Sequence, residues 1–227
     1  QLLPMTTRGD QILDRPLQQI GGKGLFIKEL EVALLNGEAD LAAHSLKDLP
    51  ATLADEFELS TVCAAADPRD ALVSNQFTSL AELPKGARVG TSSLRRQCQL
   101  LALRPDLRIK PLRGNVNTRL SKLDQGGFDA IILACAGLDR LEFSDRIRQR
   151  IDIDTLLPAV TQGIVGIEIR AGDDSTRALL APLHHQLTAR RVAAERAVNA
   201  RLGGSCQTPI AIHAIETNNL MTIRALV

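Results

Sequence analysis

Short apolar runs alternate with amphipathic stretches along the middle of the chain, from about residue 87 onward. The runs ARVGTS, LRIKPLRG and FDAIILACAG predict strands, and the stretches SLRRQCQLLALRP and VNTRLSKLDQGG between them predict helices. In the first of these helices Leu94, Cys98 and Leu101 recur at helical spacing, and Pro105 ends the pattern. Strands that alternate with helices are typical of a parallel sheet, so this region predicts an α/β domain.

The regions on either side continue the pattern. GLFIKELEVALLNG predicts an amphipathic helix that ends at Asn36-Gly37, and ADLAAHS after it predicts a strand. A third region begins near Pro182, where LTARRVAAERAVNARLGG predicts a helix. AIHAIETNNLMTIRALV then predicts a β-hairpin that turns at Asn218-Asn219.

The size of the chain agrees with several domains, because 227 residues exceed the usual single domain. Hydrophobic residues make up 44% and charged residues 23%, as in ordinary soluble proteins, and a net charge of +1 indicates no particular partner. No apolar run approaches the roughly 18 residues that a membrane span needs. Because the chain opens without Met on the strand-like QLLPM and stops on a strand, we expect it to be a piece of a longer protein, and targeting cannot be judged from it.

The cysteines divide into two kinds. Predicted core thiols stand in apolar runs: Cys63, Cys98 and Cys135. Cys206, in GGSCQTPIA, stands instead in a Gly-rich polar loop after the last predicted helix. Four cysteines without paired spacing fit a reducing cytosol, where we expect the protein to act. CxxC and HExxH spacings are absent from the sequence, so we predict no metal site.

Basic residues gather in one part of the chain. Between Lys85 and Arg119 there are nine of them, and Asp106 is the acidic residue that opposes them in that stretch. Some of them are expected to form a solvated face: Arg104, Arg108 and Lys110. The others that matter each follow a predicted strand near a helix N-terminus: Arg95, Arg96, Arg113 and Arg119. Ligands of α/β sheets bind beyond the carboxyl ends of strands, helix N-termini favour anions, and Arg captures carboxylates in a planar, bidentate way.

Nucleic acid and a small polyanion are the partners that such arginines could bind. Aromatic residues are only 2%, with no Trp or Tyr, so a stacking platform for nucleic-acid bases is lacking. GGKGLF, with Lys23, is a third Gly-rich helix start, but it lacks the spacing and the Ser or Thr of a phosphate-binding loop. We therefore favour a small molecule with several carboxylates.

HSLKDLP supplies an acidic counterpart. It follows a predicted strand, and Asp48 stands between Lys47 and Leu49-Pro50. An Asp in this position is either a turn or helix-cap residue, or a carboxylate at the mouth of the same site. In the second interpretation it would stabilise a cation or handle a proton.

Six motifs, taken in order, resemble the porphobilinogen deaminase (hydroxymethylbilane synthase) family: HSLKDLP, DPRDALVS, GTSSLRRQCQL, LRGNVNTRLSKLD, LPAVTQGIVGIE and GGSCQTPIA. The resemblance runs from about Pro4 to the end of the chain. It implies a transferase of porphyrin and heme biosynthesis, cytoplasmic and monomeric, with porphobilinogen as its substrate and no nucleic-acid or membrane partner. Ammonia is lost from porphobilinogen, and the free α-carbon of a growing chain attacks the resulting cation. After four additions, hydrolysis releases hydroxymethylbilane.

The resemblance also implies roles for individual residues. Cys206 matches the cysteine that carries a covalent dipyrromethane cofactor through a thioether, and Asp48 matches the catalytic aspartate. Other residues match positions that bind carboxylates or the cofactor: Lys23, Ser45, Lys47, Thr91, Ser93, Arg95, Arg96, Arg113, Gly114, Arg119, Arg140 and Ser205. A non-catalytic anion-binding protein of the periplasmic type is the alternative, but it would need neither Cys206 nor Asp48.

The family fold implied here is α/β with three domains, of which the first two are similar to periplasmic binding proteins. Domain one takes residues 1–63 and 164–181, domain two 69–157, and a smaller α+β domain three 186–227, incomplete here. Hinges are expected near 64–68 and 158–163, and domain movement there would accommodate a lengthening product. The match lacks the family's N-terminal strand, its Arg- and Ser-bearing loop and most of domain three, and Gln19 stands where some bacterial members have Lys.

Overall fold

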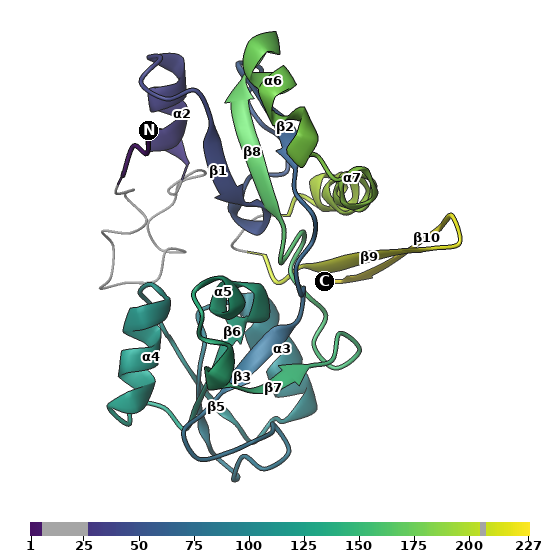
Figure 1. Ribbon diagram of the computed structural model, residues 1–227. Coiled ribbons are helices and arrows are strands. Elements are labelled where there is room, and N and C mark those ends of the chain that lie inside the picture. The colour runs from purple at the N-terminus through teal and green to yellow at the C-terminus, as the bar shows by residue number, and fades with distance from the viewer. Residues whose placement is uncertain (6–26, 205–207) are drawn as a thin grey trace.

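The computed structural model describes residues 1–5, 27–204 and 208–227. Two lobes lie one above the other, and a helix with a hairpin stands at their side (Figure 1). The first lobe contains β1, β2 and β8, and the second contains the strands from β3 to β7. The structure thus confirms the predicted fold class of two α/β units with a smaller third unit. The exact domain boundaries stay a prediction.

The first lobe is built on a sheet in which β8 (Val165–Arg170) lies between β1 (Ala42–Ser45) and β2 (Phe57–Val62). Both pairings are antiparallel. The central strand reads VGIEIR and is buried along most of its length, as a strand covered on both faces should be. α2 (Lys28–Leu35) and α6 (Asp174–Leu180) pack against this sheet, and η4 (Ala181–Leu183) follows α6.

The second lobe has a mixed sheet in the order β5-β4-β6-β3-β7. Its strands are β3 (Asp70–Val73), β4 (Arg88–Gly90), β5 (Arg108–Lys110), β6 (Ala130–Ala134) and β7 (Ile147–Ile151). β4 pairs in parallel with β5 and β6, whereas β3 is antiparallel to β6 and β7. The predicted parallel sheet is thus confirmed for β4, β5 and β6, the strands on which that prediction rests, whereas β3 lies before that region and joins the sheet antiparallel. That strand enters directly from the first lobe and not through a helix, so no crossover connection dictates its direction.

Helices cover both faces of this second sheet. Alternate residues of β6 point to opposite sides, Ala130 and Ile132 to one core and Ile131 and Leu133 to the other. α3 (Leu94–Leu103) packs on the first face, and α4 (Val116–Asp124) and α5 (Cys135–Arg140) pack on the second. FDAIILACAG was predicted as one strand, yet α5 begins at Cys135, because an apolar run alone does not distinguish a buried strand from a buried helix. η3 (Ser144–Arg146) precedes β7.

Two crossover segments, which we call the first crossover (64–68) and the second crossover (158–163), join the lobes. Their backbones touch: the Ala66 N–H donates to the Gly163 carbonyl at 3.1 Å. Gly163 has φ +88°, and a Cβ there would lie 2.9 Å from the Ala66 oxygen. A glycine is therefore required where the crossovers meet.

The third unit consists of α7 (Gln186–Arg201) and the antiparallel hairpin β9 (Ala211–Thr217) and β10 (Leu220–Leu226). Asn218 and Asn219 have φ of 51° and 62°, so the predicted turn position is confirmed. α7 lies against the hairpin, where the Nε of Arg191 donates to the Ala214 carbonyl at 2.7 Å.

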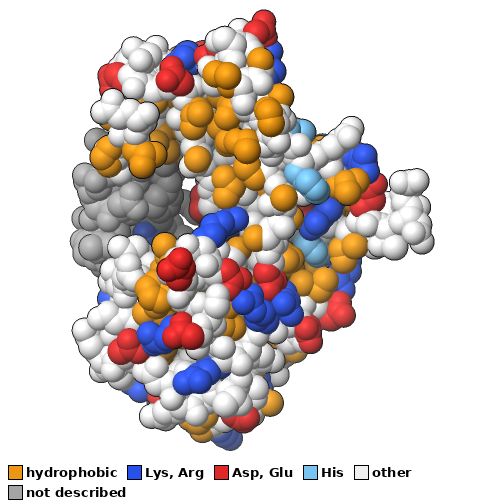
Figure 2. Space-filling view, viewed as in Figure 1, with side chains coloured by type: hydrophobic (Ala, Val, Ile, Leu, Met, Phe, Trp, Pro, Cys, Tyr) orange, Lys and Arg blue, Asp and Glu red, His pale blue; other side chains and the backbone are white. Residues whose placement is uncertain are grey.

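Two predictions about the side chains of the second lobe need correction. Cys98 is exposed on α3 and is not a core thiol, whereas Cys135 is buried and Cys63 half-buried. Arg104 is not solvated like Arg108 and Lys110, because it pairs with Asp106 at 2.8 Å and donates to two backbone carbonyls. Figure 2 shows acidic and basic side chains side by side over the visible face of this lobe.

Within the ranges 1–5, 27–204 and 208–227, no helix has the length and apolarity to cross a membrane. Over the same residues, no group of three or more His, Cys, Asp and Glu side chains is placed to hold a metal ion.

Candidate functional site at the junction of the lobes

A short turn presents Lys47 and Asp48 at the end of β1. It is η2 (Leu46–Asp48), whose Leu46 is buried and donates its N–H to the Ile164 carbonyl at 3.0 Å. Leu49 is buried as well, so apolar residues anchor the turn at both ends. Of the residues between them, Lys47 is half-buried and Asp48 is exposed.

Charges from the second lobe act on Lys47. Burial lowers its pKa to about 8, against the opposing effect of the Asp48 carboxylate, and the guanidiniums of Arg96 and Arg95 lower it further. Asp70 also contributes in the opposite sense. Lys47 therefore faces a group of charges that belongs to the other lobe.

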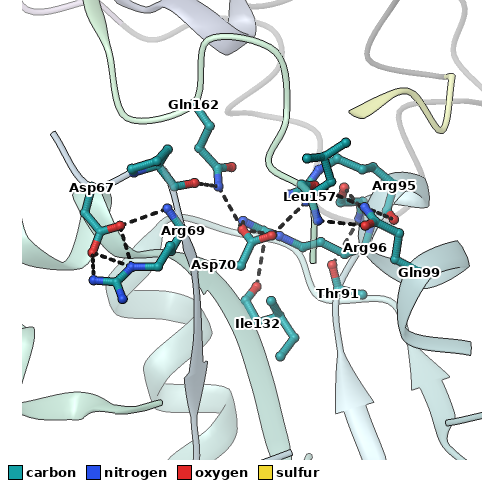
Figure 3. Close-up of polar contacts among 12 residues, drawn as sticks. Asp67, Arg69, Asp70, Thr91, Arg95, Arg96, Gln99, Ile132, Leu157 and Gln162 are labelled. Carbon is teal, nitrogen blue, oxygen red and sulfur yellow. Dashed lines mark hydrogen bonds and ion pairs between the residues drawn. The ribbon is translucent and has the colours of Figure 1, made fainter. Parts of the chain in front are cut away.

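That group is centred on Asp70, at the start of β3 (Figure 3). Oδ1 of Asp70 accepts from the Nε and Nη2 of Arg96 at 3.0 and 2.6 Å, and Oδ2 lies 2.8 Å from Nη1 of Arg95. All three side chains are buried. Burial alone would raise the pKa of Asp70, but the two guanidiniums outweigh it and hold this pKa well below its usual range.

Further hydrogen bonds fix the arginine pair. Nη1 of Arg96 donates to the Ile132 carbonyl at 3.0 Å, and Nη1 of Arg95 donates to the Leu157 carbonyl at 2.7 Å. Gln162 reaches Asp70 from the second crossover: its Nε2 lies 3.0 Å from Oδ1 and 2.7 Å from the Pro68 carbonyl (Figure 3). The arginine pair is thus held by Asp70 and by two backbone carbonyls, and Asp70 is linked through Gln162 of the second crossover to the Pro68 carbonyl of the first.

A second group of cations follows β5. Gly114 has φ +110°, and a Cβ there would lie 2.7 Å from Cγ2 of Thr118, so the tight turn into α4 requires glycine. The Gly114 carbonyl accepts from Nε of Arg119 at 2.7 Å. Arg113 is half-buried, and its buried Nε has no hydrogen-bond partner among the residues that the structure describes.

The pKa of Arg119 responds to charges from each of these groups. Burial lowers its pKa to about 10, the charges of Arg96 and Arg113 lower it further, and the Asp48 carboxylate acts in the opposite sense. Asp48 belongs to the first lobe and the arginines to the second, so the site lies between the lobes. We call the following residues the junction cluster: Lys47, Asp48, Asp70, Arg95, Arg96, Arg113 and Arg119.

The other site residues predicted from the sequence lie at different positions around the junction cluster or outside the described residues. Ser45 ends β1, and Ser93 caps α3 by accepting from the Arg96 N–H. Thr91 is buried and accepts from the Ser93 N–H at 3.2 Å. Arg140 contacts the second crossover instead, where its Nη2 donates to the Gly163 carbonyl at 2.9 Å. Three predicted residues lie outside the described residues: Lys23, Ser205 and Cys206.

Sequence reasoning missed Asp70 and Gln162 as members of the site. Both stand in motifs that were noticed, DPRDALVS and LPAVTQGIVGIE, but neither stands out locally as functional. The residues that Asp70 and Gln162 contact lie far away in the sequence. The one available signal was the surplus of arginines, which suggests that a buried carboxylate balances part of their charge.

Cations outnumber carboxylates in the junction cluster, even after Asp70 is counted. The buried Nε of Arg113, which has no partner within 1–5, 27–204 and 208–227, and a lysine whose pKa is lowered both favour an anionic group. Such a group would restore hydrogen bonds and stabilise the charged forms. Fold and site together define a two-lobed α/β protein with a surplus of cationic side chains where its lobes meet.

Comparison with known families makes this assignment specific. Residues 1–178 match the family model described as "Porphobilinogen deaminase, dipyromethane cofactor binding domain", and residues 189–227 match "Porphobilinogen deaminase, C-terminal domain". The chain belongs to the porphobilinogen deaminase family. It is accordingly a transferase of tetrapyrrole synthesis that acts on porphobilinogen and uses a dipyrromethane cofactor.

Among solved structures, the chain is similar to substrate-binding proteins. One is a putative methionine-binding lipoprotein from Bacillus subtilis, at 14% identity and a TM-score of 0.46, covering 71% of this chain and 76% of that one. Another is a periplasmic substrate-binding protein of an ABC transporter from Coxiella burnetii, at 17% identity and a TM-score of 0.47, covering 73% and 78%. At these values the likeness concerns the fold and says nothing about the ligand.

Proposed function

We propose that this protein joins four porphobilinogen molecules head to tail on a dipyrromethane primer and releases hydroxymethylbilane. Each addition breaks the carbon–nitrogen bond of one aminomethyl group and forms one carbon–carbon bond. The attacking α-carbon loses its proton, which leaves with ammonia as ammonium, and one water is consumed at the final release. The observation that carries the proposal is an exposed carboxylate, Asp48, within a cluster that is otherwise rich in cations and lies between two lobes.

The cations of the junction cluster suit the acidic arms of the substrate and the cofactor. Arg113, Arg119 and Lys47 would hold carboxylates by charge-assisted hydrogen bonds, which are stronger than neutral ones. Arg95 and Arg96 are already oriented by Asp70, so they would present fixed donors to the cofactor. When bound, dipyrromethane supplies the carbon nucleophile that starts the chain, and a thioether to Cys206 would keep it on the protein.

Asp48 has a different task. Its carboxylate would accept a hydrogen bond from a pyrrole N–H and stabilise the positive charge that develops as ammonia leaves. The other assigned residues would bind carboxylates or the cofactor around it: Lys23, Ser45, Thr91, Ser93, Gly114, Arg140 and Ser205. We further propose that the protein is a cytoplasmic monomer. A non-catalytic anion-binding protein is not favoured, because the family assignment is to an enzyme.

Replacing Asp48 tests this function. On full-length, cofactor-loaded protein, Asp48→Asn should lower kcat by about 10²–10³, because it removes one electrostatic contact to the transition state. Asp48→Glu should retain more activity, since the charge remains. Asp55→Asn is the control, an exposed carboxylate in the same lobe, and should leave kcat unchanged. If Asp48→Asn equals the wild type, or exceeds Asp48→Glu, Asp48 is only a turn residue.

A further inference from the structure

Two neighbouring residues of α7, Glu195 and Arg196, form hydrogen bonds to the backbone of two segments that flank the junction cluster. α7 lies beside the first lobe, above the hairpin (Figure 1). Glu195 is buried and Arg196 half-buried. Glu195 contacts the second crossover, which leads to the arginine pair, and Arg196 contacts the segment that follows Asp48.

Glu195 holds the second crossover. Its Oε2 accepts from the Thr161 N–H at 2.6 Å, and its Oε1 accepts from the Ala214 N–H of β9 at 2.7 Å. Thr161 has φ +56°, a left-handed conformation that β-branched residues rarely adopt and that persists only where the surroundings enforce it. The buried carboxylate is one such constraint, because it binds the backbone N–H of this residue.

The residue after Thr161 continues the connection. Gln162 donates to Oδ1 of Asp70, which in turn binds Arg95 and Arg96. A movement of Thr161 is therefore passed through one peptide unit and one side chain to the arginine pair. A path of hydrogen bonds therefore runs from α7 to the arginine side of the junction cluster.

Arg196 holds the other side. Its Nη2 donates to the Ala51 carbonyl at 3.0 Å, directly after Leu49-Pro50. The turn that bears Lys47 and Asp48 is thus fixed before it by the bond from the Leu46 N–H to Ile164, and after it by Arg196.

Packing alone does not fix this region. A hollow of about 680 Å³ lies between α7, the hairpin and the first crossover, and small side chains of that crossover line it: Ala64, Ala65 and Ala66. On the side facing the first lobe α7 packs through Val192, which joins the core cluster of Leu46 and Ile164. On the side of the hollow such packing is missing, so directional hydrogen bonds complete the placement of the helix there.

We propose that Glu195 and Arg196 are positioning residues that set the separation between Asp48 and the arginine pair. This role rests on the proposed function. It acts through the backbone of the second crossover and of residue 51, and neither side chain touches the substrate. Small errors in such a separation reduce the chemical step more than they reduce binding, because the bound groups no longer meet the reacting atoms in the right geometry.

The test compares Glu195→Gln and Arg196→Met in the full-length protein with Arg190→Met, a control on the same helix. Arg190 is exposed and pairs with Glu216 of the hairpin, away from the junction cluster. We expect kcat to fall about 10- to 100-fold in Glu195→Gln and Arg196→Met, with KM changed less than threefold, and Arg196→Lys to recover part of the loss because it keeps a donor. The control should retain wild-type kcat. Equal kcat in Arg196→Met and Arg190→Met overturns the proposal.

Hydrogen exchange supplies a readout that does not depend on turnover. Peptides covering residues 45–53 should exchange faster in Arg196→Met, and peptides covering 158–164 should exchange faster in Glu195→Gln, while the control changes neither. Unchanged exchange in both peptides overturns the proposal even if activity falls. If the wild type makes no hydroxymethylbilane, the proposed function is wrong, and the exchange of the two peptides alone decides whether α7 positions these segments.

Discussion

Asp70 and Arg96 meet in the interior of the second lobe, where one carboxylate oxygen accepts from two nitrogens of the same guanidinium at 3.0 and 2.6 Å. Both side chains are buried. Arg96 is a residue that the sequence marks as anion-binding, yet the protein itself already supplies one carboxylate to it. We infer that Asp70 orients the guanidinium and balances part of its charge, and that ligands use the donors that remain.

Asp70→Asn should therefore destabilise the protein strongly. Removing one partner of a buried ion pair leaves an uncompensated charge, which costs about 3–5 kcal/mol of unfolding free energy. Urea unfolding at pH 7 measures this loss. Asp124→Asn is the control, because Asp124 pairs with Arg146 at the surface and its removal should cost about 1 kcal/mol or less. Equal losses in the two variants would show that Asp70 is not a structural centre of the lobe.

We expect Lys47 to give the reaction a pH dependence. Because burial lowers its pKa to about 8, it loses its proton, and its ability to bind carboxylates, as the pH rises through this value. We expect kcat/KM to fall over that range, since this ratio reports the ionisation of the free enzyme. In Lys47→Arg the fall should move to higher pH, because Arg stays protonated. A descending limb at the same pH in both proteins would assign the titration to another group.

The same shift affects stability, with the opposite sign. The pKa of Lys47 in the fold lies below the value of about 10.4 for an unfolded lysine. The unfolded chain thus binds more protons between these values, and the contribution of Lys47 to stability rises with pH in that window. The titration of Lys47 therefore does not destabilise the fold above pH 8, and the expected fall in kcat/KM there would not result from unfolding.

Arg119 should bind a carboxylate of the substrate or cofactor. Its Nε donates to the Gly114 carbonyl, which leaves the two Nη groups for a ligand. The charges of Asp48 and Arg113 both affect the pKa of this guanidinium, so it lies in the junction cluster. Loss of one charge-assisted hydrogen bond costs about 1.5–3 kcal/mol, so Arg119→Ala should lower kcat/KM roughly 10- to 150-fold or block cofactor assembly. Arg108→Ala, an exposed arginine on β5, is the matched control and should behave as wild type. Normal turnover in Arg119→Ala would remove Arg119 from the site.

The sequence predicted the local elements well and the long-range relationships less well. The helix from Leu94 to Leu103 and the turn at Asn218-Asn219 follow from spacing and turn chemistry, which act over a few residues. The direction of β3 depends on where the chain enters the second lobe, and no local pattern records it. Sequence alone also assigned Cys98 to the core, because helical spacing does not say which apolar positions remain at the surface.

The candidate site shows the same division. Arg95, Arg96, Arg113 and Arg119 could be singled out because strand ends and helix starts are visible in the sequence. Asp70 could not, because its role exists only once β3 lies beside β6 and below α3. His44 was likewise unremarkable in HSLKDLP, although its Nε2 lies 2.9 Å from Glu168 in the buried part of the first lobe.

The central claim is that Cys206 carries a dipyrromethane primer for porphobilinogen condensation, and the mass of the intact protein tests it most directly. Full-length protein made in cells that supply porphobilinogen should weigh more than its sequence by two pyrrole units, and a peptide map should place that mass on residue 206. Cys206→Ser should lose the surplus while the other three cysteines stay unmodified. An active full-length enzyme without surplus mass, or with the adduct on Cys63, Cys98 or Cys135, would contradict the account.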